Sequence, residues 1–392
     1  MSVPEDCSIN PRSNFRVALI GLGAVAEPHL IAYQALGINI VGVVDPRQAR
    51  RDEIAVRYKV SAYPSIDSLL REAKPDIACI LTPASTHRHL TEQCAAAGTH
   101  VLCEKPMAVT LEDARAMSSV CERARVAFFY GSSYRYLPAL MEARRLIVAG
   151  TIGTVRLITE QMIGGKGSDA FTPMSAVHYP DGGPGGGGYG LVDHGIHMLD
   201  VFPWLCDSPI TTIVGRGDRT GTAPRAESVL MTFGSGALGT LLYDGSTFPS
   251  ELPSEGAYSE ARQWLDGRGW MGDTGQWDGA PGTLRVYGSA GSLRILHYAN
   301  KLFLNDRSGP REIHISYGTA PWHFGTQLAA FLDSLIHDRP PPTSADDGLR
   351  ALSALLAVYA SEESGQWQPV APHPEVLQSH SPSAVTQRWR RL

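Results

Sequence analysis

Between residues 15 and 130, short apolar runs alternate with amphipathic stretches of helical length. Apolar runs that end in glycine or polar residues are typical of buried strands, and we predict strands at 15–20, 38–44, 76–81, 100–103 and 126–130. Helices are expected between them, at 29–35, 47–58, 65–73, 89–97 and 111–123. Strands that alternate with helices predict a doubly wound parallel sheet, whose ligands bind at the carboxyl ends of the strands.

The pattern changes after a helix predicted at 138–149. Strands are then expected at 155–163, 210–215, 228–233, 237–243, 283–287, 292–296, 301–304 and 312–317. Hairpin turns at Gly234–Gly236 and Gly288–Gly291 predict a mostly antiparallel sheet, and therefore a second, α+β domain. One face of this sheet must be covered, and the candidates are helices at 191–205, 322–337 and 346–363. The other face is free to pair with another subunit.

The bulk properties exclude several classes of protein. The chain has 392 residues, a formal net charge of -5 and six scattered cysteines. Neither sign of charge forms a long run, so we expect no binding of nucleic acid or of an anionic membrane. No apolar run has the length of a membrane span, and residues 1–14 lack the apolar core of a signal peptide. We therefore expect a soluble, cytoplasmic protein.

A glycine-rich turn follows the first predicted strand, with the pattern G-x-G-x-x-A at Gly21–Ala26. The first glycine allows a tight turn, the second lets a pyrophosphate approach the backbone, and the final small residue lets the helix pack on the strand. Asp45 ends the second strand, where a carboxylate can bind the adenosine ribose hydroxyls. The pattern predicts a dinucleotide, with NAD favoured because Asp45 would repel a 2′-phosphate. NADP stays open because Arg47, Arg50 and Arg51 follow.

Polar residues also end two later strands, in the runs 82–87 and 104–106. Pro106 holds Lys105 extended, and both runs should border the cofactor at the edge of the sheet. The residues predicted to bind the cofactor are Gly21, Leu22, Gly23, Ala24, Val25, Ala26, Asp45, Arg50, Thr82, Pro83, His87, Glu104 and Lys105. These boundaries divide the chain into an NAD(P)-binding domain at 14–135, an α+β domain for substrate binding and oligomerisation at 136–370, and a tail at 371–392.

The stretch 182–200 joins a glycine-dense loop to the start of a helix. Asp193 and His197 are four positions apart and therefore share a helical face, which Asp200 also shares. A carboxylate beside an imidazole suits proton transfer. A surface or capping contact is the plain alternative. A metal site built from Asp193, His194 and His197 is another, and we predict no metal.

Six segments resemble, in order and spacing, the Gfo/Idh/MocA family of glucose–fructose oxidoreductase and inositol dehydrogenase relatives: GLGAVAEPH at 21–29, TPASTH at 82–87, EKP at 104–106, YRYLPAL at 134–140, AGTIG at 149–153 and GLVDHGIHMLD at 190–200. The resemblance implies a Rossmann domain followed by a domain with a large open-faced antiparallel sheet. It also implies NAD(P)-dependent oxidation or reduction of sugars, cyclitols or similar polyols. On matching positions it implies Lys105, Asp193 and His197 as the catalytic set. The stretches 182–188, 244–283 and 371–392 depart from the family pattern.

The expected function is hydride transfer between the nicotinamide and a secondary hydroxyl or keto carbon of a carbohydrate or polyol. The residues expected to contact substrate are Lys105, Arg135, His178, Tyr179, Asp193, His194 and His197. Two rival functions remain: a glycosidase of the same family that acts by transient sugar oxidation, and a non-catalytic NAD-binding regulator. We also expect a homodimer or homotetramer that forms through the open sheet face.

Overall fold

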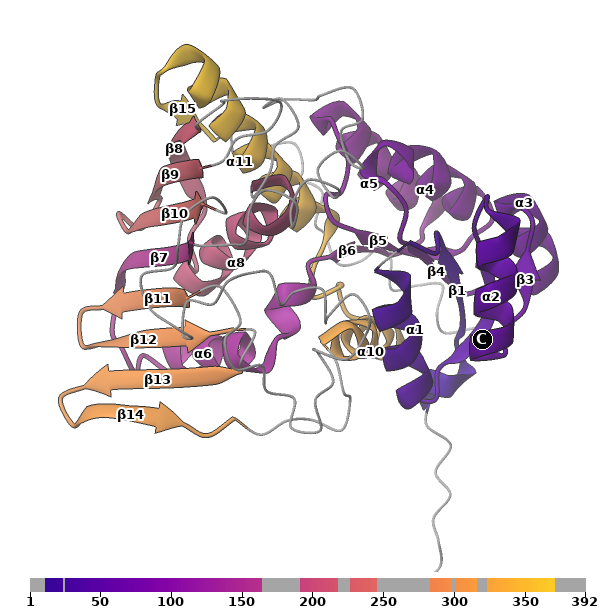
Figure 1. Cartoon of the computed structure of the whole chain (residues 1–392), viewed down its shortest axis with the longest axis horizontal. Helices are drawn as coiled ribbons and strands as arrows, with labels where there is room; N and C mark the ends of the chain where they lie inside the picture. Colours follow the sequence, from indigo (N-terminus) through magenta and orange to yellow (C-terminus); the bar gives the residue numbers. More distant parts are fainter. Residues whose placement is uncertain are drawn as a thin grey trace, which may run out of the picture.

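The computed structural model describes residues 11–23, 25–163, 191–217, 226–244, 283–297, 300–315 and 323–370. The predictions on Ala24, His178, Tyr179, the loop 245–282 and the tail 371–392 lie outside the described residues. Two sheets organise the molecule, with helices between them (Figure 1). Among the described residues, no helix is long and apolar enough to cross a membrane.

The first sheet has six strands in the order β3-β2-β1-β4-β5-β6, and every pairing in it is parallel. Its strands are β1 Arg16–Ile20, β2 Asn39–Val44, β3 Ala62–Tyr63, β4 Ile77–Ile80, β5 His100–Glu104 and β6 Phe128–Gly131. The helical segments that accompany them are η1 Pro11–Asn14, α1 Ala26–Ala35, α2 Gln48–Tyr58, α3 Ile66–Ser68, η2 Leu69–Ala73, η3 Ala84–Thr86, α4 His87–Ala96 and α5 Leu111–Ala124. The predicted doubly wound sheet is confirmed, because its strands are buried on both faces.

The second sheet has nine strands in the order β14-β13-β12-β11-β7-β10-β9-β8-β15. Its strands are β7 Val155–Ile163, β8 Ile210–Gly217, β9 Ala226–Phe233, β10 Leu238–Asp244, β11 Thr283–Gly288, β12 Gly291–Leu296, β13 Lys301–Asp306, β14 Gly309–Ile313 and β15 Gln368–Pro369. β10 lies parallel to β7, and the other described pairs are antiparallel. The mostly antiparallel sheet and both hairpin turns are therefore confirmed.

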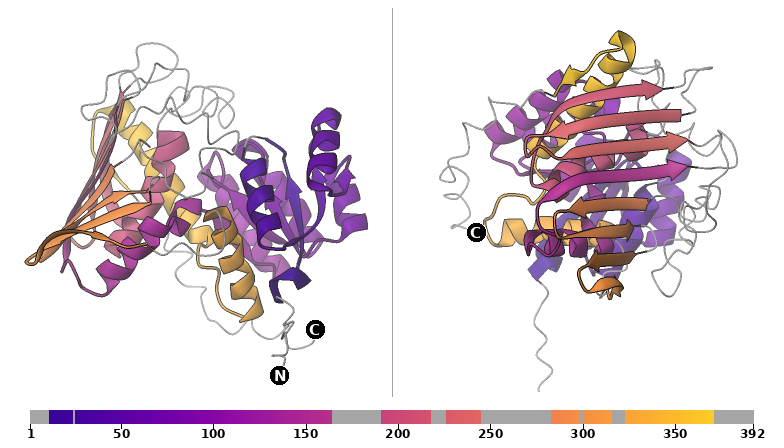
Figure 2. Two further views of the ribbon diagram at one scale, coloured as in Figure 1. Left: turned by 60° about the horizontal axis from the view of Figure 1, so that its bottom comes forward. Right: turned by 90° about the vertical axis from the view of Figure 1, so that its left-hand side faces the viewer.

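Helices cover one face of the second sheet and separate it from the first. The remaining helical segments of the described chain are η4 Ser133–Tyr136, α6 Pro138–Val148, η6 Leu191–Gly195, α8 Ile196–Cys206, α10 His323–Ile336 and α11 Ala345–Ser364, and all but α10 lie on the second sheet's side. α8 packs on β7 and α11 packs on β8, as their apolar faces predicted. Figure 2 shows the opposite face of the sheet without a helix over it.

The helix expected at 322–337 has a different position from the one predicted. α10 packs on α1 rather than on the second sheet. Phe331 stacks on Phe129 of β6, at 4.8 Å between ring centroids, and Leu328 and Leu332 join the same buried cluster as Val17 of β1. Its apolar stripe therefore completes the core of the first sheet. Amphipathicity shows that a helix needs a partner, but it does not identify the partner.

Candidate active site

The turn after β1 requires a glycine at its first position. Gly21 has φ +94°, and a Cβ there would lie 2.7 Å from Cγ2 of Thr82 and 2.9 Å from the carbonyl group of Leu81. Any larger residue would push apart the ends of the neighbouring strands β1 and β4. The tight turn therefore brings the start of α1 directly over the edge of the sheet.

The rest of the turn leaves room for a phosphate. A Cβ on Gly23 would meet no heavy atom of the described residues within 4 Å. α1 begins at Ala26, and its N-cap Val25 makes no side-chain capping hydrogen bond in the described part of the chain. Exposed backbone amides and the positive end of the helix dipole favour an anion at this position. These residues fit the pyrophosphate of a dinucleotide.

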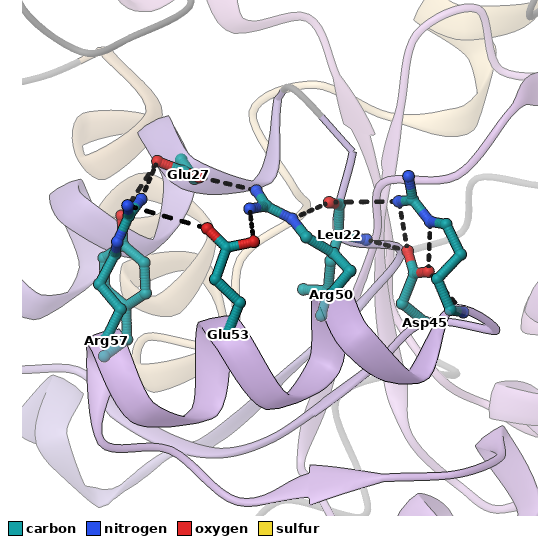
Figure 3. Close-up of polar contacts among 8 residues, drawn as sticks. Leu22, Glu27, Asp45, Arg50, Glu53 and Arg57 are labelled. Atoms are coloured by element: carbon teal, nitrogen blue, oxygen red, sulfur yellow. Dashed lines mark hydrogen bonds and ion pairs between the residues drawn. The ribbon is translucent and has the colours of Figure 1, made fainter.

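Asp45 lies at the end of β2 with its carboxylate buried against the same turn (Figure 3). It accepts hydrogen bonds from the Leu22 amide at 2.8 Å and from Nε and Nη2 of Arg47 at 2.8 and 3.0 Å. Burial opposes ionisation, but the bonds from Arg47 and Leu22 outweigh it and lower the pKa of Asp45. The carboxylate is therefore ionised and held where a ribose would lie.

Arg50 binds protein groups on all sides of its guanidinium (Figure 3). Nε donates to the Leu22 carbonyl at 2.9 Å, Nη2 to Glu27 at 2.7 Å, and Nη1 to Glu53 at 2.8 Å. Glu27 also pairs with Arg57. We call Glu27, Asp45, Arg47, Arg50 and Glu53 the ribose-side network. Both arginines of this network are held by carboxylates, Arg47 by Asp45 and Arg50 by Glu27 and Glu53, so neither can receive a 2′-phosphate without loss of an ion pair.

The predicted residues of the run 82–87 connect two loops at the edge of the sheet. Oγ1 of Thr82 bonds Thr86, whose hydroxyl also donates to the Pro83 carbonyl at 2.8 Å. The buried His87 ring lies 2.8 Å from the Thr82 carbonyl and 3.1 Å from the Met107 carbonyl. Burial lowers the pKa of His87, so the neutral ring donates to one carbonyl at a time. Its contacts brace the backbone on both sides of the cofactor edge.

Glu104 positions its neighbour Lys105. Its buried carboxylate accepts from the Lys105 amide at 3.1 Å and lies 3.1 Å from Nε2 of His29 on α1. The other ring nitrogen of His29 lies 2.8 Å from the Tyr33 hydroxyl. This network joins the end of β5 to the helix that begins at the phosphate turn. The sequence predicts Glu104 at the cofactor edge but gives no sign that His29 is its partner.

Lys105 and Asp193 meet across the two halves of the chain. Lys105 Nζ lies 2.6 Å from Oδ1 of Asp193 and 3.0 Å from the Asp193 carbonyl. Their side chains are 12% and 15% exposed, so both remain partly accessible to solvent. An ammonium group of this kind can stabilise negative charge that develops on a nearby oxygen.

His197 follows one turn later, on α8. Its ring stacks face to face on Tyr134, at 3.7 Å between centroids and 4° between planes. Its Nδ1 is buried without a hydrogen-bond partner among the described residues. Burial, and after it the charge of Lys105, holds the pKa of His197 well below its ordinary value. The ring is therefore neutral and can accept a proton.

A set of buried polar rings lies behind His197. Glu160 of β7 contacts Nε2 of His194 at 2.9 Å and accepts from the Tyr243 hydroxyl at 2.8 Å. The Tyr134 hydroxyl lies 3.4 Å from Nδ1 of His194, and the His297 ring lies 5.8 Å from that of Tyr134. We call Tyr134, Glu160, His194, His197 and His297 the histidine cluster.

Arg135 lies in a buried network of ion pairs. Its guanidinium binds both carboxylate oxygens of Asp200, which also accepts from Ser132, and lies 3.0 Å from Asp347 of α11. Arg135 is only 9% exposed, and these contacts favour a structural role over the predicted contact with substrate. Asp200 shares this role, since it holds α8 against η4.

The structure brings Lys105, Asp193 and His197 to one region, but it separates the set considered as metal ligands. Asp193 faces Lys105, while His194 faces Glu160. Among the described residues, the group with metal-ligand spacing is instead Glu160, His194 and His297. Tyr134 begins the segment 134–140 that carries part of the family resemblance, but no motif marks Glu160 or His297 in the sequence. The sequence gives no further signal for Glu160, because it stands between the polar residues Thr159 and Gln161 in its strand.

Known proteins match both halves of this arrangement. A model of the oxidoreductase family with an NAD-binding Rossmann fold matches residues 15–132, and a model of the GFO/IDH/MocA C-terminal domain matches residues 140–294. The chain belongs to the GFO/IDH/MocA oxidoreductase family. Its cofactor is accordingly NAD, and the residues at the glycine turn and Asp45 fit it.

Two named dehydrogenases and a solved oxidoreductase are among the proteins similar to this chain. The D-apiose dehydrogenase of Paraburkholderia graminis is 28% identical over 368 residues, which span 90% of this chain and 88% of that protein. The NAD(+)-dependent scyllo-inositol 2-dehydrogenase of Bacillus subtilis is 28% identical over 207 residues, 52% of this chain and 57% of that protein. An oxidoreductase from Agrobacterium radiobacter, solved with NAD+, L-tartaric acid and magnesium, has the same fold, with a TM-score of 0.73 at 20% identity over 91% of this chain and 98% of that one.

Proposed function

We propose that this oxidoreductase transfers a hydride between NAD and a secondary hydroxyl or keto carbon of a sugar or cyclitol, with Lys105, Asp193 and His197 as its catalytic residues. The observation that carries the proposal is the 2.6 Å contact between Lys105 and Asp193, which are 88 positions apart in the chain. His197 lies one turn beyond Asp193 as a neutral base. The names of the D-apiose and scyllo-inositol dehydrogenases support a polyhydroxylated substrate.

In the proposed reaction, His197, Lys105 and Asp193 each have a separate role. Bound NAD supplies the hydride acceptor. During alcohol oxidation, His197 accepts the hydroxyl proton as the hydride leaves the carbon, and it returns that proton in the reverse direction. Lys105 holds positive charge beside the reacting oxygen and stabilises the developing alkoxide. Asp193 keeps the Lys105 ammonium in place through their ion pair.

The test uses the full chain, NAD, and a panel of pentoses, hexoses and cyclitols, and it follows the absorbance of reduced nicotinamide. We expect net reduction of NAD with at least one member of the panel. Release of an aglycone from a glycoside without net reduction would identify the glycosidase alternative. Binding of NAD without reaction of any substrate would overturn the proposal in favour of a regulator.

The same proposal includes a homodimer or homotetramer formed through the open face of the second sheet. Leu230, Leu238 and Tyr287 point to this face and are 51%, 53% and 40% exposed. Leu238 of β10 and Tyr287 of β11 flank Leu157 of β7 from opposite sides, and Leu230 lies on β9, the next strand beyond β10. An apolar surface of this kind is suited to a second copy of the chain. A monomer in light scattering at micromolar concentration would contradict this assembly.

A further inference from the structure

Glu160 is a carboxylate placed in the apolar layer between the second sheet and its helices. It lies on β7 with Leu241 of β10 and Leu284 of β11 as its neighbours across the strands. Its exposure is 0%, and His194 and His297 beside it are 2% and 0% exposed. A buried carboxylate is strongly disfavoured unless it is paired or coordinates a metal. The environment therefore demands a positive partner for Glu160.

The three side chains present their ligand atoms to a common point. Oε1 of Glu160 lies 2.9 Å from Nε2 of His194 and 3.7 Å from Nε2 of His297. The ligand atoms of all three lie within 4.8 Å of one another. A tetrahedral ion with ligands at about 2.0–2.1 Å separates them by about 3.3 Å, which lies between these two distances. Each of the two distances from Glu160 is therefore within about half an ångström of the separation that the ion requires.

We propose that Glu160, His194 and His297 bind a divalent transition-metal ion, of which Zn²⁺ is the best match. Two imidazoles and a carboxylate are ligands that zinc takes, and the set contains no thiolate. The ligands come from β7, from η6 and from the residue after β12. The ion would therefore fasten η6, which carries Asp193, to the centre of the second sheet.

The surrounding groups support the ligands in the way that metal sites require. The Tyr243 hydroxyl donates to Oε2 of Glu160, which leaves Oε1 for the ion. The Tyr134 hydroxyl lies near Nδ1 of His194, the ring nitrogen that faces away from the proposed ion. Such partners fix the orientation of a ligating ring. Burial also lowers the pKa of His297 to about 4, so its ring is neutral and able to ligate.

The experiment measures metal binding directly, independently of turnover. The full chain is treated with a chelator, dialysed, and titrated with Zn²⁺ by calorimetry. We expect one equivalent to bind, and the affinity to fall by on the order of 100-fold or more in Glu160→Gln and in His297→Gln. His100→Gln is the matched control, because His100 is also a buried histidine but lies on β5 of the other sheet. Its affinity for Zn²⁺ should equal that of the wild type.

A wild type that binds no stoichiometric Zn²⁺ would overturn the proposal and leave a hydrogen-bonded cluster. Equal affinity in the wild type and His297→Gln would overturn it as well. If the ligand variants do not fold, X-ray absorption at the zinc edge of the wild-type complex decides the matter. Two imidazole nitrogens and a carboxylate oxygen support the site, while sulfur ligands place the ion at cysteines instead.

Discussion

The ribose-side network and the histidine cluster are both built from charged and polar side chains, yet they differ in origin and in environment. The first comes from residues 27–53, on α1, after β2 and on α2, and its Arg47 side chain is 63% exposed. The second draws on η4, β7, η6, α8 and the end of β12, and its members are buried. Water screens the charges of the ribose-side network, whereas burial keeps water away from the histidine cluster. The charged residues of the ribose-side network therefore act on the choice of dinucleotide. The buried groups of the histidine cluster instead shift the pKa values of its own side chains.

The largest effect is expected at His197. Replacing His197 by alanine removes the neutral base and should lower turnover at saturating substrate by ~10²–10⁴-fold. NAD affinity should stay close to that of the wild type, because the phosphate turn and Asp45 are untouched. Steady-state rates and NAD titration by fluorescence measure the two quantities. Undiminished turnover would remove His197 from the catalytic set.

Arg135 tests how much burial changes the energy of an ion pair. Arg135→Met leaves the buried Asp200 without its cation, although Asp347 keeps its ion pair with Arg350, and it should lower the free energy of unfolding by about 3–5 kcal/mol. Arg57→Met breaks the exposed contact with Glu27, and it should cost less than about 1 kcal/mol. Urea unfolding of both variants measures the difference. Similar small losses would show that burial does not distinguish the two regions.

Lys105 joins the cofactor edge to the second half of the chain. Lys105→Met keeps the aliphatic stem, and turnover should fall by ~10²–10³-fold with NAD affinity nearly kept, as for a lost donor to a developing oxyanion. If Lys105 only bound the pyrophosphate, NAD affinity would fall and turnover at saturation would survive. Retention of more than about a tenth of wild-type turnover counts against the electrostatic role.

The smallest effect is expected at the ribose-side network. Asp45→Ser removes hydrogen-bond acceptors from the ribose and releases Arg47, so the preference for NAD over NADP should narrow by roughly tenfold. Titration with both dinucleotides gives the ratio. Arg47→Ser keeps the carboxylate and should preserve the preference for NAD. An unchanged ratio in Asp45→Ser would place nucleotide selection elsewhere.

The sequence predicts the first region well because its signals are local. Gly21, Gly23 and Asp45 lie on one unit whose geometry follows from the order of strand, turn, helix and strand. Only the family resemblance places Lys105 and Asp193 in one catalytic set, because nothing in their separate motifs shows that their side chains are in contact. The structure now gives the contact directly.

The histidine cluster could not be assembled from sequence. The sequence of β7 does not show that Glu160 points inward, because both alternate sets of positions contain apolar residues, and it does not show which strands flank Glu160. Those neighbours depend on the parallel pairing of β10 with β7, and the hairpin pattern predicted antiparallel neighbours only. α10 illustrates the same limit. Its apolar face could pack on either sheet, and only the contact of Phe331 with Phe129 shows that it packs on the first sheet.

The parallel pairing of β7 with β10 also bears on the order of folding. β8, β9 and β10 can pair in sequence with their chain neighbours, but Leu157 of β7 meets Leu238 of β10 only after the segment that carries α8 has crossed the sheet. Pairing between residues distant in the chain is slow, whereas the β-α-β unit at the N-terminus depends on nearer contacts. Asp193 and His197 lie on that crossing segment. We therefore expect the nucleotide-binding domain of the nascent chain to fold early, and the catalytic site with Asp193 and His197 to form last.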